Sequence, residues 1–223
     1  MGRAVLIPLL IIAGAAAVAS RTGAAVRVVR TLDQRGGLFA PRGARLYARV
    51  APRLLRGLYR RVADDLVGRV GSGSAPTIID LGSGPGQLAI ELARRLPGAR
   101  VIGVDPAAPM RDAAARAATL AGVATATFVH GEAGAIPLPD ASADLLVSTL
   151  SMHHWPDPAA ALREIARVLR PGGEALLYDA RFVTYSDREL RRFTKGAGLD
   201  NRTIVREVLP WGRVRPWALV TMR

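Results

Sequence analysis

The sequence has no cysteine among its 223 residues. This absence excludes disulfide bonds, thiolate metal sites, iron–sulfur clusters and a cysteine nucleophile. Histidine is scarce as well, with residues only at positions 130, 153 and 154, so we expect no metal site. Half of the residues are hydrophobic, so the chain can still bury a full core, and its length suits one domain with an extension.

Acidic residues are also few. The chain has 18 acidic residues against 31 basic ones, which gives a formal net charge of +13. The excess is concentrated in residues 21–61, which hold eleven Arg and a single acid, Asp33. A basic segment of this kind attracts polyanions, either a nucleic acid or an anionic membrane surface, although an ordinary solvated surface would also explain it.

Residues 4–19 carry no charge, and Arg3 and Arg21 flank them. As a helix they would span roughly 24 Å, which is short against about 30 Å for the hydrocarbon core of a bilayer. Three interpretations stay open: a membrane anchor, a buried helix of the domain, or a signal peptide cleaved after residue 19. We favour the anchor.

These features divide the chain into three parts. Residues 1–20 form a candidate membrane anchor, residues 21–45 a basic linker, and residues 46–223 the folded domain. In the domain, apolar residues between Leu46 and Leu66 recur every four positions, which predicts a helix broken near Pro52.

From residue 77 onward, apolar strands alternate with amphipathic helices. The expected strands cover 77–81, 100–104, 125–129, 144–149 and 174–178, and the expected helices cover 87–96, 110–121 and 159–169. A capping box at 186–189 begins another helix, and 204–208 with 217–221 can close the sheet as a hairpin. The pattern predicts an α/β fold with a doubly wound, mostly parallel, seven-stranded sheet and an N-terminal helical extension, with its ligand at the carboxyl ends of the strands.

The most informative motif is a glycine-rich turn between the first expected strand and helix, in Ile-Ile-Asp-Leu-Gly-Ser-Gly-Pro-Gly-Gln at 78–87. Gly82, Gly84 and Gly86 let a ligand approach the backbone where side chains would collide with it. The dinucleotide fingerprint has a different glycine spacing, and Asp80 beside the turn would repel a pyrophosphate. An acid here favours a ligand that carries positive charge and hydroxyl groups.

Several further motifs follow in order: Val104-Asp105, Gly131-Glu132-Ala133, Leu138-Pro139-Asp140, Ser148–Trp155 and Arg167–Gly173. With the glycine turn, they resemble the class I S-adenosylmethionine-dependent methyltransferases, in particular the small-molecule branch with the quinone-pathway enzymes. The resemblance implies S-adenosylmethionine as cofactor and a Rossmann-like sheet. It places these residues at the cofactor: Asp80, Gly82, Ser83, Gly84, Gly86, Gln87, Asp105, Pro106, Glu132, Ala133 and Ser148.

The resemblance also implies roles. Asp105 would accept hydrogen bonds from the ribose diol, and Asp80 would organise the ammonium group of the methionine portion. Glu132 stands where the family keeps an Asp beside the adenine, so its longer side chain shifts that contact, and Ala133 backbone can share the role. Ser148 matches the fourth-strand position at which the family's backbone contacts the methionine amino group of the cofactor.

Methyl transfer from a sulfonium needs alignment and exclusion of water, and it needs a base only when the acceptor holds a proton. His153 and His154 follow the expected fourth strand, so one of them can orient or deprotonate the acceptor; packing on Trp155 is the alternative. Tyr47 lies in a stretch that resembles the family's cofactor lid, with core packing as its alternative.

The apolar and basic features of residues 1–61 favour a small-molecule, lipid or quinone-like acceptor at the cytoplasmic face of an anionic membrane. A nucleic-acid substrate is disfavoured, because the Asn/Asp-Pro-Pro-aromatic motif of amino-methylating enzymes is missing and the basic segment offers few aromatics for base stacking. An RNA methyltransferase and a non-catalytic S-adenosylmethionine-binding regulator stay open as alternatives. The oligomeric state is not predicted.

Overall fold

The computed structural model describes residues 53, 55–70, 75–180, 184–199, 203–211 and 214–223. The apolar segment 4–19, most of the basic stretch and Tyr47 therefore lie outside the described residues. The elements are α4 (Arg56–Arg69), β1 (Thr77–Leu81), α5 (Gln87–Arg95), β2 (Arg100–Asp105), α6 (Ala108–Leu120), β3 (Ala126–His130), β4 (Ala143–Thr149), η1 (Met152–His154), α7 (Pro158–Val168), β5 (Leu169–Ala180), α8 (Asp187–Ala197), β6 (Ile204–Trp211) and β7 (Val214–Met222).

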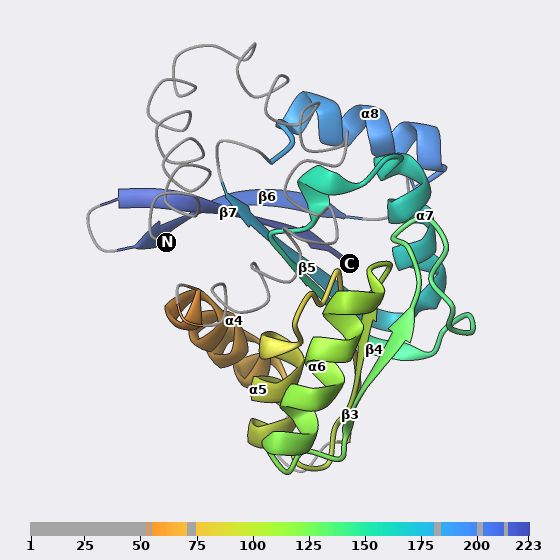
Figure 1. The fold of residues 1–223 in the computed structure, drawn as a ribbon. Helices are drawn as coiled ribbons and strands as arrows, with labels where there is room; N and C mark the ends of the chain where they lie inside the picture. The colour runs from red at the N-terminus through yellow and green to blue at the C-terminus, as the bar shows by residue number, and fades with distance from the viewer. Residues whose placement is uncertain (1–52, 54, 71–74, 181–183, 200–202, 212–213) are drawn as a thin grey trace.

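The strands form one seven-stranded sheet in the order β3-β2-β1-β4-β5-β7-β6, with helices against it (Figure 1). β1 pairs in parallel with both β2 and β4, whereas β7 runs antiparallel to β5 and β6. The predicted doubly wound, mostly parallel sheet and its closing hairpin are confirmed. The strand order reverses between β1 and β4, which is the place where such sheets bind ligands.

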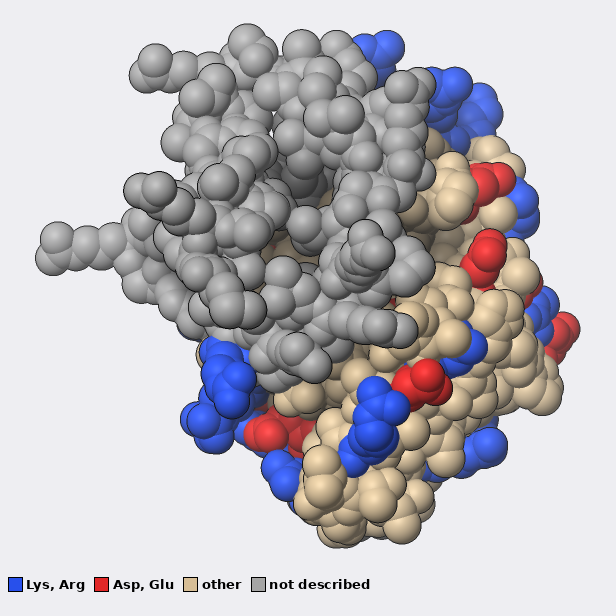
Figure 2. Space-filling view, in the orientation of Figure 1, with Lys and Arg blue, Asp and Glu red and all other residues tan. Residues whose placement is uncertain are grey.

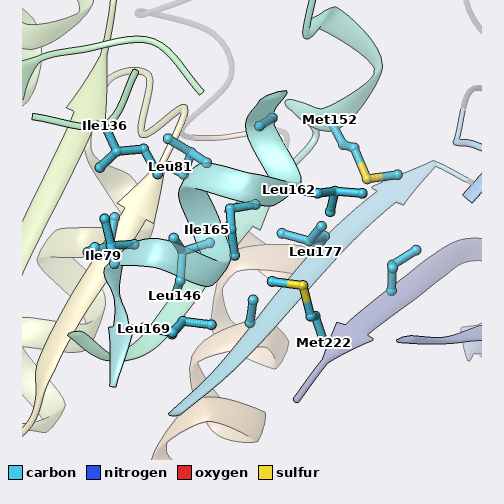
Figure 3. Packing of buried hydrophobic residues seen from close by; sticks show 14 of the residues in the cluster. Ile79, Leu81, Ile136, Leu146, Met152, Leu162, Ile165, Leu169, Leu177 and Met222 are labelled. Atoms are coloured by element: carbon cyan, nitrogen blue, oxygen red, sulfur yellow. The ribbon is translucent and has the colours of Figure 1, made fainter. Parts of the chain in front are cut away.

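Two apolar layers cover the two faces of the sheet. Ile79 and Leu146 point to one face, where they pack with Leu162 and Ile165 of α7 and with Leu177 of β5 (Figure 3). The intervening residues of the same strands pack on the other face with α4 and α5, in a cluster that includes Ile78, Val147, Leu58, Val62, Leu66, Leu88 and Leu92. Side chains alternate between faces along a strand, so strands buried on both faces read as continuous apolar runs.

The start of β5 differs from the sequence prediction. The strand was expected to begin at residue 174, but it begins at Leu169 and contains the tripeptide Pro171-Gly172-Gly173. Leu169 already has extended backbone angles and pairs with Ala143, and the register then shifts by a bulge before Leu145 pairs with Glu174. Gly172, with φ of +80°, accommodates the irregular stretch without ending the strand.

The core predicts a large contrast between two Leu→Ala substitutions. Leu146 is 0% exposed at the centre of β4, so Leu146→Ala should lower the free energy of unfolding by about 2–5 kcal/mol through lost burial and a cavity. Leu120 is 89% exposed, so Leu120→Ala should change it by less than about 0.5 kcal/mol. Chemical denaturation of both variants measures the contrast, and equal losses would contradict this core.

Candidate active site

The glycine turn after β1 is tied to the end of the neighbouring strand β2. The amides of Gly82 and Ser83 both donate to the Val104 carbonyl, at 2.8 and 3.1 Å. Gly82, Gly84 and Gly86 have φ of +73°, +52° and +77°, a region that residues with a Cβ rarely adopt. The three glycines are thus required by the backbone path of the turn.

The turn also leaves little space on its inner side. A Cβ at Gly82 would overlap the Ser151 hydroxyl and lie 2.6 Å from Ser151 Cβ, and one at Gly86 would lie 2.7 Å from the Phe128 ring. At Gly84, in contrast, no heavy atom lies within 4 Å of the Cβ position. The turn packs on the protein through two of its glycines and presents open space at the third.

Asp105 ends β2 and holds the middle of the turn. Its Oδ2 accepts a hydrogen bond from the Gly84 amide at 2.8 Å, and its Oδ1 accepts one from the Ala107 amide at 2.9 Å. Burial raises the pKa of this carboxyl, and the two amides and the charge of Arg111 oppose the rise. The carboxylate is fixed in place and keeps acceptor capacity on both oxygens for a ligand.

Asp80, at the end of β1, is buried, and neither carboxylate oxygen has a hydrogen-bond partner among the described residues. Burial raises its pKa to about 7; the nearby Ala89 amide offsets part of the rise and the charge of Asp105 adds to it. The buried hydroxyls of Ser83 and Ser148 are likewise without partners in the described part of the chain. Buried polar groups are normally hydrogen-bonded, so the unpartnered oxygens of Asp80 indicate a ligand that supplies donors.

The other predicted cofactor residues lie around the same edge of the sheet. Gln87 begins α5 directly after the turn, and Pro106 follows β2 with its carbonyl accepting from Arg111 at 2.8 Å. Glu132 and Ala133 follow β3, where Glu132 forms a backbone bridge with Ala135 and has an exposed side chain. The edge therefore carries buried acceptors at its centre and accessible groups on its β3 side.

The chain after β4 folds back onto the glycine turn. Leu150 has φ of +54°, an unusual value for a residue with a branched side chain, and its amide donates to the Tyr178 carbonyl at 2.8 Å. Ser151 then packs against Gly82, and its Oγ accepts from the Trp155 indole at 3.2 Å. This bend places the 3₁₀ turn η1 next to the glycine turn.

His153 is held by Asp179, a residue that the sequence analysis missed. His153 Nδ1 lies 2.9 and 2.8 Å from the two carboxylate oxygens, and its backbone amide donates to Oδ2 at 3.2 Å. The ring of His154 lies against that of His153, with a centroid distance of 3.9 Å and an interplanar angle of 45°. A signal for Asp179 exists in the sequence: it is the penultimate residue of an apolar strand, as Asp80 is, and Asp105 is the last residue of another.

Comparison with known proteins identifies the fold and the motifs together. Residues 79–177 match the family described as a methyltransferase domain. A crystal structure of a proposed S-adenosyl-L-methionine-dependent methyltransferase from Methanococcus maripaludis is similar, with a TM-score of 0.66 and 25% identity over 80% of this chain and 91% of that one. Residues 79–177 therefore form a class I S-adenosylmethionine-dependent methyltransferase domain.

Curated relatives share the central part of this chain. A demethylmenaquinone methyltransferase from Thermus thermophilus is 38% identical over 102 residues, which is 46% of each chain. A trans-aconitate 2-methyltransferase from an Azoarcus species is 36% identical over 136 residues, covering 61% of this chain and 51% of the relative. The chain thus spans about half the length of the curated relatives it matches.

S-adenosylmethionine, the cofactor of this family, fits the residues that the structure brings together. Two buried carboxylates, Asp80 and Asp105, suit a ligand with a sulfonium, an ammonium and a ribose diol. Gly84 leaves space for the methionine portion, and the unpartnered Ser83 and Ser148 hydroxyls offer further hydrogen bonds.

Tyr47 lies outside the described residues, so its predicted place in a cofactor lid stays a prediction. Among the described helices none is long and apolar enough to cross a membrane.

The turn predicts that Gly82→Ala is far more damaging than Gly122→Ala. Both positions have positive φ, +73° and +66°, so both variants bear a similar backbone strain of about 1–2 kcal/mol. Only Gly82→Ala also collides with Ser151, because nothing lies within 4 Å of the Cβ position at Gly122. Calorimetry with S-adenosylhomocysteine should show at least a roughly tenfold weaker affinity for Gly82→Ala and wild-type affinity for Gly122→Ala. Equal affinities would contradict the close packing.

The pKa of Asp80 predicts pH-dependent cofactor binding. Since this pKa is about 7 in the free protein, Asp80 is mostly protonated at pH 5.5, and pairing with the ligand ammonium requires it to lose that proton. Affinity should therefore fall as pH decreases below 7, approaching about tenfold per pH unit. Calorimetry in buffers of different ionisation enthalpy measures the released proton. Asp80→Asn should abolish the release, and an unchanged release in that variant would contradict the assignment.

Proposed function

We propose that this protein transfers the methyl group of S-adenosylmethionine to a quinone-like or lipid acceptor at the cytoplasmic face of an anionic membrane. The observation that carries the membrane part is a basic stripe on α8. Arg188, Arg191, Arg192 and Lys195 are exposed and follow the spacing i, i+3, i+4, i+7, which places them on one face of the helix.

The packing of α8 aims this stripe outward. Leu190 is buried in the core, and Phe193 packs against the same cluster, with its ring in a T-shaped contact with Tyr185. The acidic Glu189 is engaged in the capping box with Ser186, at 2.8 Å, so it does not lie along the stripe. Figure 2 shows blue side chains at the upper right, where Figure 1 places α8, and further blue side chains elsewhere on the same face.

The stripe adds to the charge that the sequence concentrates before the domain. Residues 21–61 carry ten of the thirteen net positive charges and follow the uncharged segment 4–19. A basic surface combined with an apolar segment is how peripheral proteins bind anionic leaflets. Binding to the leaflet would bring the site close to an apolar acceptor dissolved in it. One relative is named a demethylmenaquinone methyltransferase, so by its name it acts on a quinone.

At the site, the chain's contribution is alignment. Asp105 and the glycine turn would fix the nucleoside and methionine ends of the cofactor, and Asp80 would balance the ammonium charge. The bound cofactor supplies an electrophilic methyl carbon. Because the turn and η1 are packed together through Gly82 and Ser151, the acceptor and the methyl group can be held in line with little motion.

The α8 stripe predicts salt-sensitive binding to anionic vesicles. Replacing Arg191, Arg192 and Lys195 by Gln should weaken binding to phosphatidylglycerol vesicles roughly 100-fold, from about 1 kcal/mol per charge near the surface. The matched control replaces three exposed Arg elsewhere, Arg94, Arg100 and Arg116, and loses the same charge. Vesicle sedimentation of the full chain measures the affinity of both variants for the vesicles. Equal losses of affinity would show that only the net charge matters, and would contradict a specific role of the α8 stripe.

The acceptor itself is tested with methyl-labelled cofactor and separated lipid, RNA and small-molecule fractions of the source cells. We expect the label in the lipid fraction, with a faster rate when anionic vesicles are present. Label in RNA would overturn the proposal and favour an RNA methyltransferase. Tight cofactor binding with no label in any fraction would favour a non-catalytic regulator.

A further inference from the structure

We propose that the Glu164–Arg167 pair of α7, here called the α7 clamp, positions the nucleobase side of the cofactor site and sets its preference for a purine with a 6-amino group. The clamp acts through the loop 131–142, which joins β3 to β4 and carries Glu132. The inference rests on cofactor binding, as the proposed function does, and it does not depend on the identity of the methyl acceptor.

The α7 clamp holds Ile136 at both of its backbone polar groups. Glu164 Oε2 accepts a hydrogen bond from the Ile136 amide at 2.9 Å, and Arg167 Nη2 donates to the Ile136 carbonyl at 2.9 Å. The Ile136 side chain is buried in the core cluster that α7 covers (Figure 3). Backbone groups and side chain together fix this residue on α7, in the way that pairing with a neighbouring strand would.

Arg167 binds the later part of the loop as well. Its Nη1 donates to the Leu138 carbonyl at 2.9 Å and to Asp140 Oδ1 at 2.7 Å. Its own carbonyl accepts from the Ala141 amide at 2.9 Å. One residue of α7 therefore contacts the loop at positions 136, 138, 140 and 141.

The two side chains of the clamp also fix each other. Arg167 Nε and Nη2 donate to Glu164 Oε1 and Oε2 at 2.8 and 2.7 Å, which is the two-point geometry that a guanidinium forms with a carboxylate. The hydrogen bonds from Arg167 lower the pKa of the Glu164 carboxyl against the opposing effect of burial, and the Ile136 amide adds to the lowering. Glu164 is therefore ionised at neutral pH and accepts from the loop.

The fixed loop leaves the Glu132 backbone little freedom. Gly131 precedes it and is packed between two side chains, because a Cβ at Gly131 would lie 2.5 Å from Pro137 Cδ and 2.8 Å from Val104 Cγ1. Pro137 directly follows the residue that α7 holds, and a backbone bridge joins Glu132 to Ala135. Glu132 is thus held on both sides, so loss of the clamp should free it.

Glu132 lies beside the cofactor residues at the sheet edge. His130 is the β3 residue paired with Asp105, the carboxylate that holds the glycine turn, and the exposed Glu132 comes two positions later. Val104, whose side chain packs on Gly131, also supplies the carbonyl that accepts two amides of the turn. Glu132 therefore borders the site that Asp105 and the turn form.

A fixed carboxylate at this place can distinguish two purines that a mobile one cannot. Adenine has a hydrogen-bond donor at its 6-amino group, whereas hypoxanthine has an accepting oxygen there and a donor at the adjacent N1. A carboxylate only accepts, so a mobile one can move from the first donor to the second, but a fixed one loses its donor and meets a second acceptor. The clamp should therefore act on the ratio of the affinities for the two bases.

The test is calorimetry of the full chain with S-adenosylhomocysteine and with its deaminated analogue, S-inosylhomocysteine. The readout is the ratio of the two dissociation constants, because a smaller binding-competent fraction weakens both affinities by the same factor and leaves the ratio unchanged. We expect the wild-type protein to prefer the adenine form at least about tenfold, from one charged hydrogen bond. Arg167→Gln should narrow this preference to within about threefold, mainly by weakening binding of the adenine form.

Arg95→Gln is the matched control. The Arg95 side chain is 28% exposed against 30% for Arg167, and it also binds two carboxylates, those of Glu91 and Asp64. It lies near the end of α5 that is remote from the glycine turn. This variant loses a comparable ion-pair network but should keep the wild-type preference.

Two further variants test each end of the mechanism. Glu132→Gln should lose the preference, because an amide can both donate and accept and so suits either base. Glu164→Gln disrupts the clamp while keeping an oxygen that can accept from the Ile136 amide, and it should narrow the preference at least about threefold. It tests the clamp even where Arg167→Gln does not fold.

The possible results separate the roles of these residues. An unchanged preference in folded Arg167→Gln or Glu164→Gln, or an equal loss in Arg95→Gln, would overturn the role of the clamp. A wild-type protein that binds S-adenosylhomocysteine without preference, or a preference kept by Glu132→Gln, would overturn the role of Glu132. Failure of the wild-type protein to bind either compound would instead contradict cofactor binding and the proposed function, so the failures are distinguishable.

Discussion

The attachment of the glycine turn to the end of β2 is the constraint on which the site depends. Two amides of the turn bind the Val104 carbonyl, and the Asp105 carboxylate binds the Gly84 amide. The turn then has one open side, at Gly84, and one packed side, at Gly82, where Ser151 lies. Through Ser151 the chain after β4 is positioned as well, so the same attachment that shapes the cofactor site also locates His153.

The site is acidic, whereas the molecule as a whole is basic. The chain carries a net charge of +13, yet β1, β2 and β5 each end in or near a buried aspartate, at Asp80, Asp105 and Asp179. Burial raises the pKa values of the Asp80 and Asp105 carboxyls, although at Asp105 two amides and the charge of Arg111 oppose the rise. A ligand with a sulfonium and an ammonium offsets the cost of this burial, and the basic outer surface is left to attract anionic partners.

Much of the fold and the cofactor side could be predicted from the sequence, because those signals are local. β1 has the predicted bounds, since a short apolar run ends at the glycine turn, and the Ser186–Glu189 capping box begins α8 as expected. The start of β5 could not be predicted, because pairing of Leu169 with Ala143 outweighs the local Pro-Gly-Gly signal. The strand-end position of Asp179 is visible in the sequence, but its contact with His153 spans 26 positions, which periodicity does not encode.

The central claim is that the carboxyl edge of β1, β2 and β4 binds S-adenosylmethionine. A crystal structure of the protein with S-adenosylhomocysteine tests it most directly. We expect the ribose hydroxyls on Asp105, the methionine portion along Gly82–Gly86, and the ammonium group near Asp80, with the Asp179 contact to His153 retained. A ligand bound elsewhere, or one that leaves both Asp80 and Asp105 without contact, would contradict the claim.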